Sequence, residues 1–135
     1  MQEVSQSGEP LSQLRPLDPL AELMILDTRK RYPMGFFIEC CCDGQLDRER
    51  LQRALDAVAL RHPNIRSCMR WKVGRPFWKT TQLGPQLLWD PIHSGANPWQ
   101  AFDLAAESGL RLIVFPEQSS STSSWKLVLF GHHSV

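Results

Sequence analysis

Two adjacent histidines, His132 and His133, are the residues of this sequence best suited to chemistry, and they follow the apolar run LVLF. An imidazole has an unperturbed pKa of about 6.5, so a neutral ring nitrogen is available near pH 7 to accept a proton. On a strand, neighbouring side chains point to opposite faces, so the two rings are not expected to share a metal ion. Ser134 would point away from His133 for the same reason, which argues against a serine nucleophile. Alone, the pair fits either a general base or a structural role.

The four cysteines are the other groups capable of chemistry. Cys40, Cys41 and Cys42 are consecutive, and Cys68 stands alone. Strand alternation prevents the triplet from converging on one ion. Cys40 and Cys42 could share a face, but no CxxC pair or histidine lies at ligand spacing. We therefore expect no metal site, and we interpret the cysteines as small buried hydrophobic residues in a reducing compartment.

The composition is that of a single soluble domain. The chain has 135 residues, 42% of them hydrophobic and 21% charged, with a formal net charge of +1. No basic stripe alternates with aromatic residues, so no nucleic-acid partner is expected. No apolar run is long enough to span a bilayer, and the first ten residues, MQEVSQSGEP, lack the apolar core of a signal peptide. These features predict a cytoplasmic protein without a membrane span.

The first half of the chain predicts a tail, a helix, a strand and a second helix. Residues 1–15 contain few apolar side chains and are expected to form a mobile tail. The segment LDPLAELMILDTRK predicts a helix with Asp18 as N-cap, and FFIECCC predicts a strand. A second helix is expected to begin after Asp47 and to end at Pro63. Its apolar stripe is formed by Leu51, Ala54, Leu55 and Val58.

The second half predicts mainly strands. The segment NIRSCMRWKVGRPFWKTT reads as a hairpin with Gly74 and Pro76 at the turn, and residues 84–100 read as loops. GLRLIVFP and WKLVLFGHH are expected to pair as antiparallel strands across the serine-rich segment EQSSSTSS. The predicted fold class is therefore α/β of the two-layer α+β kind, with a mixed, largely antiparallel sheet and helices packed on it.

Three segments, in this order, resemble the condensation-domain-like acyltransferases and together cover about residues 18–135. In that family an L-x-x-A-L helix leads into R-H-P-x-L-R, and an F-D-L…L-R stretch precedes the motif HHxxxDG. The matching residues of the first segment are Leu51, Ala54, Leu55, Arg61, His62, Pro63 and Arg66, with Ile65 where leucine is commoner. Those of the second are Phe102, Asp103, Leu104, Leu110 and Arg111. GHHSV resembles the opening of HHxxxDG.

The resemblance implies the fold of chloramphenicol acetyltransferase and of nonribosomal peptide condensation domains, in which two similar subdomains enclose a tunnel. Residues 16–135 would form the N-terminal subdomain, one half of that fold. Members transfer an acyl group from a thioester to a hydroxyl or amine, here of a small molecule or lipid. The thioester is carried by coenzyme A or by the phosphopantetheine of a carrier protein, as a co-substrate and not as a tightly bound cofactor. The resemblance assigns the chemistry to His133, with His132 in support.

The sequence departs from the family after Val135, where it ends before the Asp and Gly of the motif. The second subdomain is missing as well. We therefore expect an incomplete, inactive N-terminal part of an acyltransferase. The alternative is a non-catalytic half-domain that acts as an interaction module or self-associates through an open apolar face. In either case we expect Arg61, Arg66 and Arg111 to brace the subdomain through ion pairs.

Overall fold

The computed structural model describes residues 14–117 and 123–135, which form two β-sheets and two α-helices. The elements are β1 (Leu14–Pro16), α1 (Pro19–Asp27), β2 (Gly35–Asp43), α2 (Arg48–Arg61), the 3-10 helix η2 (Pro63–Arg66), β3 (Ser67–Lys72), β4 (Arg75–Thr80), β5 (Gln86–Trp89), β6 (Leu110–Glu117) and β7 (Ser124–His132). This α+β architecture confirms the predicted fold class. None of the helices in the described part of the chain is long and apolar enough to cross a membrane.

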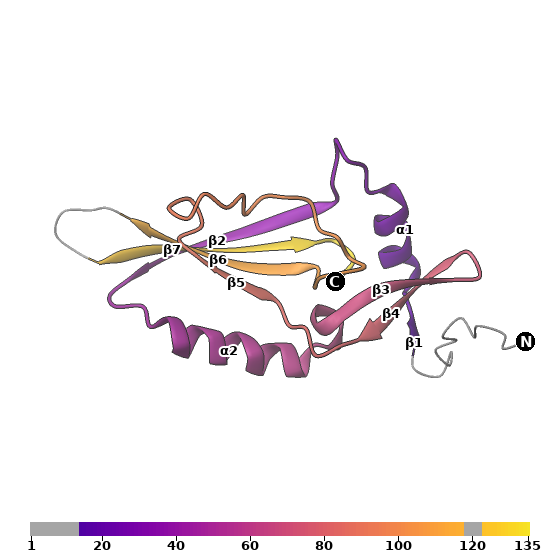
Figure 1. Cartoon of the computed structure of the whole chain (residues 1–135), viewed down its shortest axis with the longest axis horizontal. Helices are drawn as coiled ribbons and strands as arrows, with labels where there is room; N and C mark the ends of the chain where they lie inside the picture. The colour runs from indigo at the N-terminus through magenta and orange to yellow at the C-terminus, as the bar shows by residue number, and fades with distance from the viewer. Residues whose placement is uncertain (1–13, 118–122) are drawn as a thin grey trace, which may run out of the picture.

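The two sheets lie beside each other along the length of the molecule (Figure 1). One has the strand order β1-β4-β3 and lies with α1 at one end of the molecule, whereas the other has the order β2-β7-β6-β5. The C-terminus lies between them, because β7 ends where the sheets meet (Figure 1). The main-chain N–H of Met69 on β3 donates to the carbonyl of Leu104, which joins the small sheet to the segment that enters β6.

Helix α1 begins where the sequence predicts. The carboxylate of Asp18 accepts the main-chain N–H groups of Leu20 and Ala21 at 3.0 and 2.9 Å, and Pro19 occupies the first turn. The buried side chains of α1 pack in a hydrophobic cluster with residues of the small sheet and of the segment before β6. The cluster consists of Leu17, Ala21, Ile25, Trp78 and Leu104.

The predicted hairpin is formed by β3 and β4, but its turn differs from the prediction. The turn residues are Val73 and Gly74, both with positive φ (48° and 74°), and Pro76 lies inside β4 opposite Trp71. A two-residue turn with two positive φ angles matches the twist of the flanking strands, and glycine adopts such angles without steric cost. The assignment of Pro76 to the turn was therefore wrong.

Helix α2 is capped as predicted, but its buried face is narrower. Asp47 accepts two main-chain N–H groups of the first turn at 2.9 and 3.1 Å. Leu55 and Ala59 are buried, whereas Ala54 and Val58 are exposed. The predicted stripe was therefore wrong at Ala54 and Val58, because only the i, i+4 row that includes Leu55 and Ala59 faces the protein.

The large sheet contains one strand that the sequence did not predict. β6 and β7 pair antiparallel as expected, and β2 pairs antiparallel with the other side of β7. β5 pairs parallel with β6, although it lies in the predicted loop region 84–100. Its four residues are too few to display a strand alternation in the sequence. Segment 90–109 then crosses one face of the sheet, where the ring of Trp99 lies 5.7 Å from that of Phe130.

The last two residues of the predicted tail, Leu14 and Arg15, belong to β1. Leu14 is buried, and β1 pairs antiparallel with β4. The guanidinium of Arg15 donates to the side chains of Asn64 and Ser67 at 3.0 and 2.8 Å, which attaches β1 to the start of β3. Residues 1–13 and 118–122, which include most of the tail and of the serine-rich segment, lie outside the described residues.

The cysteine triplet lies on the edge strand β2 and is accessible. Cys40 and Cys41 are exposed and Cys42 is half-buried, whereas Cys68 is buried. The expectation of buried cysteines is therefore confirmed for Cys68 and wrong for the triplet. The physical reason is the position of β2, which has a neighbouring strand on one side only and is exposed on both faces from residue 37 to residue 41.

Candidate active site at the end of β7

The two histidines at the end of β7 have opposite environments. His132 is 3% exposed, whereas His133 is exposed. The main-chain N–H of His132 donates to the carbonyl of Gly109, and that of His133 donates to the carbonyl of Met34, both at 2.8 Å. These hydrogen bonds hold the backbone of His132 to the residue before β6 and that of His133 to the residue before β2. This alternation places one ring in the packed interior and the other at the surface.

Both ring nitrogens of His132 are engaged in hydrogen bonds. The main-chain N–H of Ser134 donates to Nδ1 at 3.2 Å, so Nδ1 is an acceptor and the proton lies on Nε2. Nε2 is 2.7 Å from Oγ1 of Thr28, whose hydroxyl donates to the carbonyl of Met24. The hydroxyl of Ser134 is also 2.7 Å from Nδ1. Ser134 therefore supports His132.

The pKa of His132 is lowered, first because burial disfavours the charged ring and second because His133 is close by. A neutral ring whose single lone pair already accepts hydrogen bonds cannot take a proton from a substrate without breaking them. The arrangement suits His132 to holding the end of β7 in place.

The His133 ring lies at the surface beside Phe36. Its centroid lies 5.2 Å from that of the Phe36 ring, with the planes tilted by 43°. Its ring nitrogens make no hydrogen bond to any described residue. Phe36 in turn packs against Gly131, where a Cβ atom would lie only 2.9 Å from two of the ring carbons. Any larger residue at position 131 would force the Phe36 ring to shift from its place beside His133.

A cavity of about 230 Å³ lies beside the buried histidine, where the two sheets meet. His132 and Thr28 line it together with Met69 of β3 and residues 102–105. Asp103 is the only carboxylate among the described lining residues. Asp103 also caps a turn, because its side chain accepts the main-chain N–H of Ala105 at 3.2 Å. The polar groups of this cavity thus already have structural partners.

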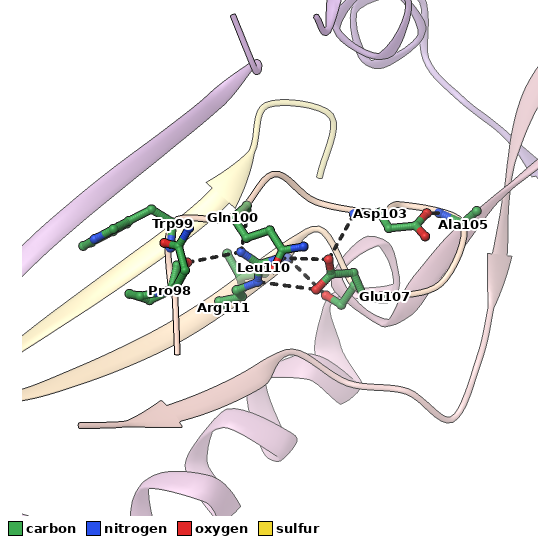
Figure 2. A network of polar contacts seen from close by, with 10 residues as sticks. Pro98, Trp99, Gln100, Asp103, Ala105, Glu107, Leu110 and Arg111 are labelled. Carbon is green, nitrogen blue, oxygen red and sulfur yellow. Dashed lines mark hydrogen bonds and ion pairs between the residues drawn. The ribbon is translucent and has the colours of Figure 1, made fainter. Parts of the chain in front are cut away.

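A buried cation fixes the segment that crosses the large sheet (Figure 2). The Arg111 side chain is 6% exposed and forms an ion pair with Glu107 at 2.8 Å. Its guanidinium also donates to the carbonyls of Pro98 and Gln100 and lies 4.2 Å from the centroid of the Phe102 ring. Arg111 therefore braces the subdomain as predicted, and it is occupied by protein groups on several sides.

The other residues of the family resemblance take structural or surface positions. Leu104 and Leu110 are buried. Arg61 is exposed at the end of α2, and neither Arg61 nor Arg66 forms an ion pair with a described residue, so bracing by these two was wrong. Sequence reasoning missed Glu107 as the partner of Arg111. Its i, i+4 spacing is a signal in helices, but this segment is not helical.

The sequence matches no family model and no curated protein. Solved structures, in contrast, are similar over most of the chain. One contains the X-domain and OxyB from teicoplanin biosynthesis; it is 21% identical, has a TM-score of 0.64, and is matched over 92% of this chain and 28% of that chain.

Two other similar structures are condensation domains. The first is a mutant starter condensation domain of rhizomide synthetase RzmA in complex with C8-CoA, with 12% identity, a TM-score of 0.70, and coverage of 92% of this chain and 32% of that chain. The second concerns condensation-domain-mediated chain release from the enacyloxin polyketide synthase, with 18% identity, a TM-score of 0.58, and coverage of 98% and 29%. This chain thus spans under a third of each, and it has a condensation-domain-like fold.

Proposed function

We propose that this chain is the N-terminal part of an acyltransferase of the condensation-domain superfamily, with His133 as the general base. One observation carries the proposal. Of the two histidines at the end of β7, only His133 has an exposed ring whose nitrogens make no hydrogen bond to a described residue. His132 uses both nitrogens to hold Thr28 and Ser134. This division of roles is the one that the resemblance to the HHxxxDG motif implies.

In the proposed reaction, His133 accepts the proton of an acceptor hydroxyl or amine as that group attacks the carbonyl of an acyl thioester. The resulting tetrahedral intermediate collapses, the C–S bond breaks, and the imidazolium returns the proton to the departing thiolate. Such help is worth about 10² to 10⁴ in rate. The similar RzmA structure holds C8-CoA, which supports a thioester of coenzyme A or of carrier-protein phosphopantetheine as the co-substrate.

The proposal also concerns the part of the condensation-domain-like fold that this chain does not contain. The chain covers 28% to 32% of the similar chains described above. Large apolar side chains are also exposed on α1 and β2, and their exposed fractions exceed half. They are Leu20, Leu23, Leu26, Phe37 and Ile38. We infer that further protein covers part of this surface and completes the substrate tunnel, so the chain alone should be inactive.

The test uses a longer protein that contains this sequence, assayed with acyl-CoA and acyl-phosphopantetheine donors. His133→Ala should lower kcat/KM by about 10² to 10⁴ without changing the circular dichroism spectrum. His93→Ala is the matched control, because His93 is an exposed loop residue at the limit of ion-pair distance from Asp90 (4.0 Å). Unchanged activity of His133→Ala would exclude the general-base role. If the 135-residue chain alone shows turnover, and His133→Ala abolishes it, the rest of the fold is not needed for catalysis.

A non-catalytic interaction module is the second candidate, and the same exposed apolar side chains favour it. The similar X-domain structure contains the protein OxyB, so a related fold occurs in complex with another protein. In this case the chain should associate in sedimentation experiments, and Ile38→Asp should weaken the association. His133→Ala should leave it unchanged, because the exposed imidazole contributes little apolar area.

A further inference from the structure

The edge strand β2 carries two thiols in an arrangement suited to a common ligand. Cys40 and Cys42 are two residues apart, so their side chains leave the same face of the strand, and their Sγ atoms are 3.9 Å apart. Cys41 lies between them and points to the opposite face. Cys40 is exposed and Cys42 is half-buried, so the pair is accessible from solvent.

The separation of the two sulfur atoms indicates the class of ligand. Two thiolates on a tetrahedral zinc-type ion, with metal–sulfur bonds of about 2.3 Å, lie about 3.8 Å apart. The observed 3.9 Å therefore requires almost no movement of Cys40 or Cys42. A disulfide would require the same atoms to approach to about 2.05 Å across one strand residue. Magnesium and calcium prefer oxygen ligands and are not expected here.

The surroundings leave room for an exposed ion with two protein ligands. The residues of β7 opposite Cys40 and Cys42 are Leu127 and Trp125, which are uncharged, and the other side of β2 has no paired strand in the described chain. No cluster of three or more His, Cys, Asp or Glu side chains suited to a metal occurs among the described residues. Water or a small solute would fill the remaining positions.

The sequence alone predicted no metal site at these cysteines, but the 3.9 Å separation of their Sγ atoms favours one. We propose that Cys40 and Cys42 chelate one thiophilic cation of the zinc type. Each Sγ–H bond breaks as a metal–sulfur bond forms, so two protons pass to solvent per ion and no group is oxidised. Because binding releases protons, protons compete with the cation.

The experiment is a titration of the reduced 135-residue chain with Cd²⁺, followed by ultraviolet thiolate-to-cadmium charge transfer and repeated with Zn²⁺ as competitor. We expect one ion and two released protons per chain. Cys40→Ser and Cys42→Ser should each weaken binding on the order of 100-fold, the upper end of the effect of disturbing even an indirect ligand contact. Cys41→Ser is the matched control, since Cys41 is also exposed but faces the other way.

Several results would overturn the proposal. The wild-type chain could give no charge-transfer band, or Cys41→Ser could weaken binding as much as Cys40→Ser does. Half an ion per chain would indicate that the metal bridges two molecules. Equally tight binding in denaturing urea would show that the strand geometry does not create the site. Circular dichroism of the serine variants establishes that each remains folded.

Discussion

Replacement of the buried Arg111 by methionine should be among the most damaging single substitutions in the chain. Methionine keeps much of the side-chain volume but removes the charge, the ion pair with Glu107 and the donors to Pro98 and Gln100. The Glu107 side chain is 18% exposed, so its carboxylate would remain largely shielded without its cation. The contact of the guanidinium with the Phe102 ring would also be lost.

The size of the loss in stability follows from the polar groups that Arg111→Met leaves without a partner. Removing one partner of a buried ion pair typically costs about 3–5 kcal/mol, because the other charge stays desolvated. Water can replace the donor at Gln100, which is exposed, but access to the carbonyl of the buried Pro98 is poorer. We therefore expect Arg111→Met to lower the free energy of unfolding by about 3–5 kcal/mol. The whole free energy of unfolding of a domain is only about 5–15 kcal/mol.

Urea denaturation followed by circular dichroism measures this loss. With a slope of about 2 kcal/mol per M, the midpoint should fall by about 2 M. Arg75→Ala is the comparison, because Arg75 forms an ion pair with Glu22 at 3.0 Å but its side chain is 68% exposed. It should cost far less than Arg111→Met, because solvent screens this exposed pair. If Arg111→Met costs no more than Arg75→Ala, the guanidinium does not brace the segment that crosses the sheet.

Substitutions at three further positions test other parts of the structure in the same unfolding assay. The pKa of His132 is lowered in the folded chain, so the unfolded chain binds more protons than the folded chain as the pH falls below about 6.5. The free energy of unfolding should therefore decrease by up to about 1.4 kcal/mol per pH unit. His132→Gln should remove this pH-dependent component. Gly131→Ala would place a Cβ 2.9 Å from the Phe36 ring and should cost about 1–3 kcal/mol. Asp47→Ala should cost about 1 kcal/mol through the lost N-cap, whereas Asp47→Asn should be nearly neutral. A flat pH profile, or a neutral Gly131→Ala or Asp47→Ala, would contradict the corresponding contact.

The elements that the sequence predicted well are those determined by local chemistry. Asp18 and Asp47 accept main-chain N–H groups at the predicted helix starts, because a short carboxylate satisfies donors that have no other partner. The errors concern neighbours distant in sequence. β5 exists because β6 offers it hydrogen-bond partners, and the exposure of Cys40 follows from the edge position of β2. Neither neighbour is visible within a short window of sequence.

The candidate site shows the same division. Strand alternation predicts that His132 and His133 face opposite ways, but it cannot say which ring is buried. That depends on Thr28, 104 residues away from His132 at the end of α1, which hydrogen-bonds to its Nε2. Glu107 escaped prediction for a similar reason, since it meets Arg111 across an irregular segment and not on a helix.

The two proposed sites are linked by the face of β2 that they share. Phe36, which contacts His133, lies on the same face as Ile38, Cys40 and Cys42, because side chains two residues apart leave a strand together. Ile38, which is 58% exposed, lies next after Phe36 on this face, so a protein that covers the face to build a tunnel around His133 would also contact Ile38. If the cover extends along β2, it would also shield the two thiols. Cadmium uptake should then be slower in a longer protein than in this chain, whereas equal uptake would limit the cover to the end of β2 nearest His133.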